Sequence, residues 1–502
     1  MRTADAHGMP VSRRYALASD GFGAGRLRHG GRSHDWLIGG LILLVCHVVL
    51  AAVSPRFAYE ADPLGKPVVP FVTLLVTGGA AFLLVARYLR HSRLSHGQLL
   101  AAIAMGLAMR VILVPSVPIL EDDWYRYLWE GALTANGISP YEHVPQEAID
   151  SINGAGTAPP ALRHLAEQAG WILQRANQPT IRSVYPPVAQ MALALAWWIQ
   201  PWSLAAWKLV LLCLDPAILA LILATLRRLE LPAGWSLLYW WNPLLIKEVF
   251  NSGHMEPLVL VFVMGAVLLA MQRHFVTSSA VLALAAGAKL WPIVLLPILL
   301  RPALARPRRL VPAVLVFATM AGILLAPMLS REDRSSGACT NYWLRWQSNA
   351  AMFQIVVCGM EQAYGVLGQP AWHAQWWARL LTSMAAVFWV LWLASHPMRD
   401  PRDVAGRCLL AVAGVFLLSP TGFPWYATWM IPLLAIQPRW SLLALAVVMP
   451  LYYLRYWFEA CRLAWWFDHV VVWVEFLPVW GLMAWESWRR GAAQFYASGS
   501  HL

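Results

Sequence analysis

The stretch QLLAAIAMGLAMRVILVPS (residues 98–116), followed by EDDWYRYLWEGALTANGISPY (residues 121–141), decides the fold of this chain. The first part is an apolar run that is long enough to cross a bilayer as a helix. The second part begins with three adjacent carboxylates and continues with an arginine among aromatic rings. Because charge at a membrane surface carries a desolvation cost, groups packed this densely are usually functional.

The composition extends this interpretation to the whole chain. Of the 502 residues, 59% are hydrophobic and 13% are charged, whereas a soluble protein carries about 25% charged residues. Apolar runs recur along the entire length, and the 29 tryptophans fit a protein with many membrane interfaces. The sequence therefore predicts an all-α polytopic membrane protein, a bundle of about 13–14 transmembrane helices.

The net charge of +12 does not indicate a nucleic-acid partner. The basic residues occur in short clusters between apolar runs: Arg26, Arg28 and Arg32; Arg87, Arg90 and Arg93; Arg227 and Arg228; Arg301 to Arg309; Arg489 and Arg490. Such clusters mark cytoplasmic loops. We therefore expect membrane lipids around the protein and no nucleic acid.

These clusters divide the chain into a membrane domain and two tails. Residues 1–34 are polar and lack an apolar core, so we expect a cytoplasmic tail and no cleavable signal peptide. Residues 35–490 form the predicted transmembrane domain, with a long outer loop at 117–185, and residues 491–502 form a second cytoplasmic tail. The expected spans lie at about 36–53, 69–86, 98–116, 206–226, 235–250, 257–272, 309–327, 373–395, 404–420, 425–437, 441–457 and 469–485.

Three segments need separate interpretation. Residues 186–201 either span the membrane or form a short or re-entrant helix; we prefer the second, because it leaves Arg227 and Arg228 inside. Residues 276–302 are broken by Lys289-Leu-Trp-Pro292. A lysine in mid-span costs roughly 3 kcal/mol, so we expect two short helices that meet outside at Lys289. Residues 164–178 predict a surface helix.

With this topology, the polar segments all lie on the outer side. They are residues 121–143, 182–190, 251–257, 289, 331–350, 419–426 and 454–459. A channel would distribute polar groups through the depth of the bilayer. The pattern instead predicts a binding or reaction cavity that opens to the outside and to the outer leaflet.

The outer loop supplies the first candidate residues. A carboxylate such as Asp122 or Asp123 beside aromatic rings suits a general base, or a ligand of a divalent cation; it could also simply end a span. Arg126 lies one helical turn later, where it pairs with a carboxylate or binds a phosphate. Glu130 could support another polar residue of the loop or lie on a solvated helix face, and we favour the solvated face.

Later segments supply the other candidates, each with a structural alternative. Lys289 is a compact cation at a helix break, where it suits the phosphate of a leaving group. The remaining candidates are Arg182 for a phosphate or lipid headgroup, Tyr185 at a proline-defined helix start, His254 and Glu256 for a metal or an acceptor hydroxyl, and Trp425 and Tyr426 for a sugar ring or an interfacial belt. If the cavity holds a divalent cation, we expect Asp123 and Glu256 to bind it. Cys339 and Cys358 share a predicted outer loop, where a disulfide is one possibility.

Five of these segments resemble, in order, a known family. They are the spacing Asp123-x-Tyr125-x-Tyr127 with Gly131, Gly137 and Pro140-Tyr141, then SVYPP (183–187), NPLLIKEVFNSGHMEPL (242–258), AKLWP (288–292) and PWYATWMIP (424–432). The chain is similar to the polyprenol-phosphate-mannose-dependent mannosyltransferases of the GT-C fold, including the bacterial α-(1→6)-mannosyltransferases. It departs from them at Glu130, where many relatives have aspartate, at Met255, where they have asparagine, and at Pro186, where they have glycine.

The resemblance implies a membrane glycosyltransferase of the GT-C type whose first outer loop is catalytic. Its donor would be a hexosyl group, mannosyl by the family, on a polyprenyl phosphate, and its acceptor a glycan or glycolipid outside the plasma membrane, on the periplasmic or exterior face. In such enzymes an outer-loop aspartate acts as base or metal ligand, and Asp123 is the matching position. The alternatives are a transporter or flippase of a lipid-linked or amphiphilic substrate, which predicts polar groups at mid-bilayer depth, and a non-catalytic member of an envelope-assembly complex.

Overall fold

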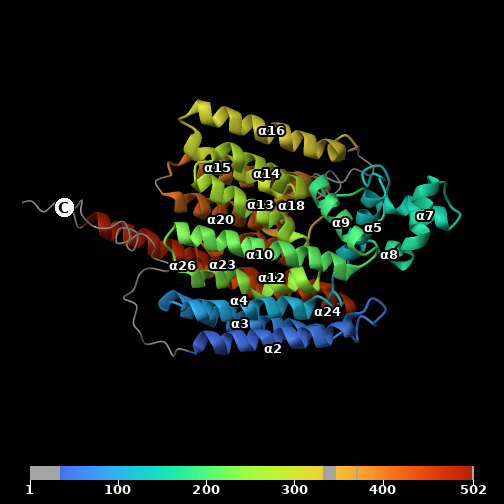
Figure 1. The fold of residues 1–502 in the computed structure, drawn as a ribbon, viewed down its shortest axis with the longest axis horizontal. Helices are drawn as coiled ribbons and strands as arrows, with labels where there is room; N and C mark the ends of the chain where they lie inside the picture. The colour runs from blue at the N-terminus through green and yellow to red at the C-terminus, as the bar shows by residue number, and fades with distance from the viewer. Residues whose placement is uncertain (1–33, 332–345, 369–370, 399, 500–502) are drawn as a thin grey trace, which may run out of the picture.

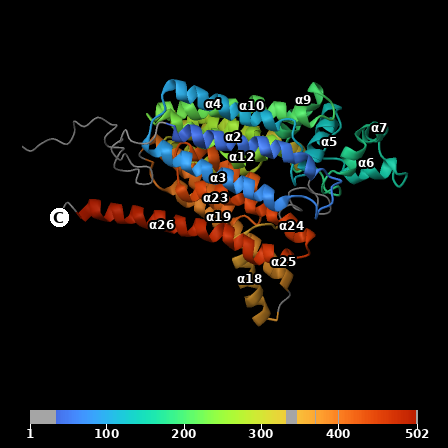
Figure 2. The ribbon, with the colours of Figure 1, turned by 90° about the horizontal axis from the view of Figure 1, so that it is seen from below.

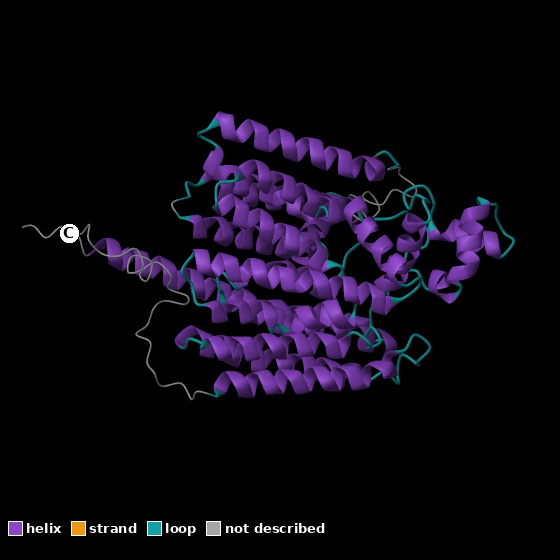
Figure 3. Cartoon of the chain, viewed as in Figure 1, coloured by secondary structure: helices purple, strands orange, loops and turns teal. Residues whose placement is uncertain are grey.

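Helices run side by side through the body of the molecule in a computed structural model of the chain (Figure 1). The structure describes residues 34–331, 346–368, 371–398 and 400–499, and these residues contain no β-strand (Figure 3). Eight of the described helices are long and apolar enough to cross a membrane. The all-α, multi-pass class predicted from composition is confirmed.

The first three spans follow the predicted boundaries closely. They are α2 (Asp35–Val53), α3 (Val68–His91) and α4 (His96–Leu113). A capping box starts α4: the Ser95 hydroxyl accepts from the Gln98 amide, and the Gln98 side chain accepts from the Ser95 amide. The other long helices are α10 (Leu204–Arg228), α16 (Pro307–Leu329), α19 (Ala371–Ser395), α20 (Pro401–Leu418) and α26 (Val472–Gly499).

Two segments that we predicted as continuous spans are chains of short helical turns. Residues 235–250 fall in η3 (Ala233–Ser236), α11 (Leu237–Trp240), α12 (Pro243–Ile246) and the π-helix η4 (Lys247–Asn251). Residues 425–437 fall in α21 (Pro424–Ala427), η7 (Thr428–Met430) and α22 (Ile431–Leu434). The prediction of single helices was wrong there, because proline removes the backbone N–H that continuous helical hydrogen bonding needs.

The chain also breaks at Lys289, as predicted. α13 (Glu256–Met271) and α14 (Phe275–Ala288) precede the break, and η5 (Trp291–Leu295), α15 (Leu296–Leu300) and η6 (Arg301–Ala303) follow it. Lys289 itself has extended backbone angles (φ −157°, ψ 143°) and ends α14. Its side chain is therefore at the end of a helix rather than within a span.

The outer loop forms a small helical unit at one end of the bundle (Figure 1). Its helices are α5 (Asp123–Ala135), α6 (Pro145–Ile152), α7 (Pro160–Ala169) and α8 (Trp171–Gln174). They share a core of their own around Trp129, Leu133, Leu162, Leu165 and Leu173. The helix predicted over 164–178 is interrupted at Gly170, whose φ is +53°.

The ambiguous segment at 186–201 forms the short helix α9 (Pro187–Ile199). Its 13 residues rise only about 20 Å, which is less than the bilayer core of about 30 Å. α9 packs against α5, and a Cβ atom added to Gly131 would lie 2.6 Å from the Leu193 carbonyl oxygen. The glycine therefore allows the two helices to approach closely.

The last third of the chain completes the bundle. α18 (Ala351–Val366) projects from its side (Figure 2). α23 (Trp440–Val448), η8 (Met449–Tyr453) and α24 (Leu454–Ala460) together form one apolar stretch that is long enough to cross a membrane, where a span was predicted at 441–457. α25 (Ala464–Trp466) and η9 (Phe467–Val471) lead into α26. Cys358 is exposed on α18 rather than in a loop, and Cys339 lies outside the described residues.

A buried ion pair joins α4 to α10 inside the bundle. The Arg110 guanidinium donates to Asp215, and both side chains are 0% exposed. Arg110 also donates to the Trp240 carbonyl at 2.7 Å, and Tyr239 donates to Asp215. Charges within a membrane are tolerated when they face the protein interior and pair in this way.

Candidate active site

Asp123, the first residue of α5, points into the protein, whereas Asp122 is exposed. The Asn177 amide group donates to both carboxylates, at 3.0 Å to Asp122 and 2.6 Å to Asp123. The other oxygen of Asp123 accepts from the Tyr127 hydroxyl at 3.4 Å and lies 3.8 Å from Nδ1 of His254. Asp123 is thus the carboxylate that faces other polar groups.

Burial dominates the electrostatic environment of Asp123. Loss of water raises the pKa of its carboxyl group, while the positive charges of His254 and Lys289 partly oppose that rise. A carboxylate that is three-quarters buried and partly desolvated is a stronger base than one in water, because protonation relieves its desolvation. These are the properties of a general base.

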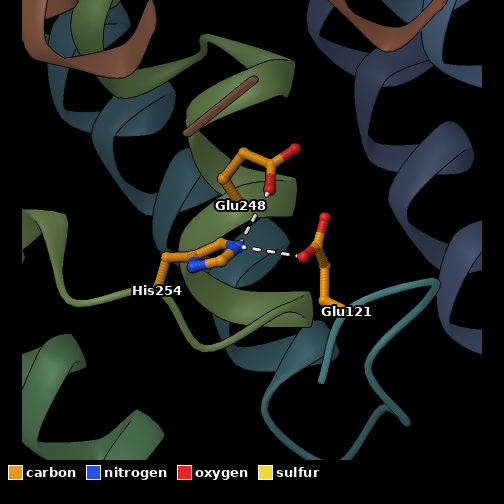
Figure 4. A group of neighbouring side chains, drawn as sticks. All are labelled: Glu121, Glu248 and His254. Carbon is orange, nitrogen blue, oxygen red and sulfur yellow. Dashed lines mark ion pairs between the residues drawn. The ribbon is translucent and has the colours of Figure 1, made fainter. Parts of the chain in front are cut away.

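On its other side, His254 faces two more carboxylates (Figure 4). Its Nε2 atom lies 3.6 Å from Oε2 of Glu121 and 3.6 Å from Oε2 of Glu248. One ligand atom from each of Glu121, Glu248 and His254 lies within 4.8 Å of the other two. Burial alone lowers the pKa of His254, but the two glutamates outweigh it, and the pKa is raised overall. This group, Glu121–Glu248–His254, is one that could hold a metal ion.

Local backbone features place these residues. Leu120, just before Glu121, has φ +59°, a conformation that costs energy for a residue with a side chain and often occurs at functional sites. The Asn251 side chain accepts from the Ile119 amide at 3.1 Å and donates to the Val117 carbonyl at 2.8 Å. Glu248 is part of the π-helix η4, a rare turn that is frequent at functional sites.

Lys247 and Tyr453 support the carboxylates from the protein interior. The Tyr453 hydroxyl lies 2.8 Å from an oxygen of Glu121 and 2.8 Å from one of Glu248, and it accepts from Lys247. The Lys247 ammonium group is 3.4 Å from Glu248, and both side chains are 0% exposed. A buried carboxylate needs such partners, because an isolated buried charge is strongly unfavourable.

A further basic group of the site is Lys289. Its ammonium group donates to Oε1 of Glu256 at 2.6 Å and lies over the rings of Tyr426, at 4.8 Å, and Trp429, at 5.4 Å. Trp429 donates to the same glutamate oxygen at 3.4 Å. The second oxygen of Glu256, Oε2, is buried and has no hydrogen-bond partner among the described residues, so it is available to a ligand.

Aromatic rings connect the two halves of the site. Trp425 stacks on His254 with ring centroids 4.3 Å apart and on Phe423 at 4.4 Å, and it is only 8% exposed. Tyr426 is half-buried and stacks on Trp429 at 4.4 Å. Of the two aromatic candidates, Trp425 supports His254, and Tyr426 is the more open to a sugar.

Tyr185 completes the contacts around Asp123. Its ring meets Tyr127 edge to face with centroids 5.2 Å apart, and its carbonyl accepts from Tyr141 at 2.8 Å. The structure therefore brings together, from segments far apart in the sequence, the candidates Asp123, Tyr185, His254, Glu256, Lys289, Trp425 and Tyr426.

Arg126 does not join them. Its guanidinium is 3% exposed and donates to Glu130 at 2.7 Å and to carbonyl oxygens of Asn177, Gln178 and Ile181. The expectation of a solvated Glu130 was wrong: this side chain is 1% exposed and also accepts from Ser183 and Gln190. The pair closes the outer loop, which leaves Arg126 no access to a phosphate.

Arg182 also binds elsewhere in the loop. It is half-buried and donates to the Arg331 carbonyl oxygen at 2.8 Å. Its assignment to the donor phosphate remains a prediction.

Several residues of the site carry no clear signal in the sequence. Glu121 and Glu248 were visible as polar residues, but nothing in their spacing shows that they share a histidine. Lys247 and Tyr453 lie in segments predicted as spans, 206 residues apart. Asn177 had no signal beyond its place in the outer loop.

The fold and the site define a class of protein: a multi-pass membrane protein with a polar, partly buried site at one end of its helices. Residues 37–305 match the family described as alpha-(1->6)-mannopyranosyltransferase, N-terminal domain, which covers more than half of the chain, and the protein belongs to this family. It is therefore a glycosyltransferase, which uses a sugar donor and a glycan acceptor. No match was found among curated proteins or among solved structures.

Proposed function

We propose that this protein transfers a hexosyl group, mannosyl by its family, from a polyprenyl phosphate to a hydroxyl group of a glycan or glycolipid on the outer face of the membrane. One observation carries the proposal: an unbroken series of contacts runs from Asp123 through His254, Trp425 and Tyr426 to Lys289. These contacts support the assignment of Asp123 as a candidate base and of Lys289 as a candidate phosphate ligand in the same site.

The chemistry follows from these two groups. Asp123 removes the proton of the acceptor hydroxyl as its oxygen forms a bond to the anomeric carbon of the sugar. The bond from that carbon to the phosphate oxygen breaks, and the lipid phosphate leaves with the electron pair. Lys289 stabilises the negative charge on the departing phosphate, since a fixed cation in a water-poor site acts strongly. Oε2 of Glu256 is a candidate acceptor for a sugar hydroxyl.

The position of the site supports a lipid donor. The outer loop and α9 lie at one end of the bundle, and α2 begins and α26 ends at the other (Figure 1). The basic residues Arg90, Arg227 and Arg228 occur in the last turns of α3 and α10. An excess of arginine favours the cytoplasmic side, so the site would face outward, where a lipid tail can remain in the bilayer during transfer.

The proposal is tested with membranes that contain the protein, labelled polyprenyl-phosphate mannose and a glycan acceptor. We expect a labelled glycan from the parent protein and from Asp150→Asn, a control in the same outer loop. Asp123→Asn should lose most of the product. Equal transfer by Asp123→Asn would show that Asp123 is not the base. Movement of label into vesicles without any covalent product would instead indicate a transporter.

Sidedness needs a separate experiment. In sealed right-side-out vesicles, an acceptor that cannot cross the membrane should be glycosylated, and in inverted vesicles it should not. The opposite result would place the site on the cytoplasmic side.

A further inference from the structure

The group Glu121–Glu248–His254 has a geometry that its protein contacts do not explain. Nε2 of His254 is buried, yet no hydrogen-bond partner lies near it among the residues that the structure describes. The two nearest oxygens, of Glu121 and Glu248, are both 3.6 Å away, too far for a hydrogen bond. A buried nitrogen that points between two carboxylates at equal distances is aimed at a ligand (Figure 4).

The spacing suits a metal ion. Two ligands that each lie about 2.1 Å from an ion at a tetrahedral angle are about 3.4 Å apart. The two separations of 3.6 Å at Nε2 are close to that value. One imidazole and two carboxylates are ligands that first-row transition metals accept, whereas magnesium and calcium favour oxygen alone.

The charges around the group also favour a divalent cation. The carboxylates of Glu121, Glu248 and Asp123 all lie near His254. Among the described ion pairs, Glu248 has one basic neighbour other than the histidine, and this neighbour is Lys247. When His254 is neutral, as a metal ligand must be, three carboxylates against one ammonium group leave two excess negative charges, which one divalent ion neutralises. Because the side chains of Glu121 and Glu248 are only 5% and 0% exposed, water contributes little to stabilising their negative charges.

The other nitrogen of His254 completes the pattern. Nδ1 faces Asp123 at 3.8 Å and the Tyr127 hydroxyl at 3.5 Å. In metal sites the ring nitrogen that does not bind the metal usually faces a carboxylate or another polar group, which orients the ring. Asp123 stands in that position, and Trp425 holds the ring from its face at 4.3 Å.

We propose that Glu121, Glu248 and His254 form a binding site for a divalent first-row transition-metal cation, with Asp123 as the carboxylate that orients the histidine. This ligand set differs from the pair Asp123 and Glu256 that the sequence suggested. Glu256 pairs with Lys289 instead. The inference concerns metal binding and does not depend on the proposed transfer reaction.

The test uses the purified full-length protein in detergent, stripped with a chelator and desalted, with Mn²⁺ alone as the probe. The signal of free aqueous Mn²⁺ in electron paramagnetic resonance measures how much is bound. We expect one tight site per chain in the parent protein. Glu248→Gln and His254→Asn should abolish that site, and Asp123→Asn should weaken it about 10–100-fold. Glu475→Gln, which changes a carboxylate that is equally buried at 0% exposure, should bind as the parent does.

Two results would overturn the inference. One is a parent protein that binds no Mn²⁺ tightly. The other is undiminished binding by Glu248→Gln and His254→Asn. If either variant does not elute from a sizing column as a single species, Glu121→Gln replaces it. The number of Mn²⁺ ions bound tightly per parent chain still tests the inference without any variant. No sugar donor is present, so a negative result leaves the transfer reaction standing, and a metal-binding but inactive protein would contradict that reaction alone.

Discussion

The ammonium group of Lys289 lies 2.6 Å from Oε1 of Glu256, 33 residues earlier in the chain. The contact fixes the lysine at the break after α14, in a half-buried position with 18% of its side chain exposed. A cation held in place before the reaction loses no energy to reorganisation when charge develops on a leaving phosphate.

Lys289→Met should therefore lower kcat by about 10²–10³, the usual cost of removing one such group. Lys289→Arg keeps the charge and should retain more activity. Lys66→Met, the same change at a lysine between α2 and α3, should transfer sugar at the parental rate. A rate for Lys289→Met equal to that of Lys66→Met would exclude the lysine from the reaction.

Replacement of Trp425 tests whether it positions His254. Trp425→Ala removes a stacked ring that is worth about 0.5–1.5 kcal/mol, which corresponds to a fall of about 2–12-fold in kcat/KM. Trp425→Phe should recover most of that loss, because it restores a ring face at the same place. If Phe and Ala reduce the rate equally, the indole contributes something other than stacking.

The buried pair of Arg126 and Glu130 should matter for stability rather than for chemistry. Arg126→Met leaves a carboxylate that is 1% exposed without its charge partner, and such a change costs about 3–5 kcal/mol. Arg163→Met breaks an ion pair of the same spacing on α7 whose side chains are 57% and 53% exposed, and should cost less than about 1 kcal/mol. Thermal unfolding in detergent compares the two, and a similar decrease in Tm would contradict the assignment.

Gly131 should tolerate no side chain. In Gly131→Ala the new Cβ would lie 2.6 Å from the Leu193 carbonyl oxygen, so α5 and α9 must separate, at a cost of about 1–3 kcal/mol. The matched change Gly322→Ala, in α16, meets nothing within 4 Å and should leave Tm unchanged or slightly raised. A Tm for Gly131→Ala equal to the parental value would mean that the helices do not pack this closely.

The sequence predicts helices well where hydrophobicity alone determines them. The bounds of α2 to α4, the short α9 and the break at Lys289 follow from apolar runs, prolines and a lysine that could not remain in lipid. Residues 235–250 were misjudged because an apolar composition does not distinguish one continuous helix from several turns packed against each other.

The site was only partly predictable for a different reason. Asp123, His254 and Lys289 stand in motifs that are visible locally, but Tyr453 contacts Glu121 across 332 residues, and no local pattern encodes that contact. Glu130 was misassigned because its partners Ser183 and Gln190 come from the far end of the outer loop and from α9. Pairings of this kind depend on the packed bundle.

The ion pair between Arg110 and Asp215 has a consequence for how the protein is made. The two residues are 105 positions apart, so at about 5–20 residues per second the ribosome supplies the aspartate on the order of 5–20 s after the arginine. During that interval α4 carries an unneutralised guanidinium in its last turn. Because a guanidinium without a partner is unfavourable in lipid, we expect α4 to leave the insertion machinery together with α10 rather than before it.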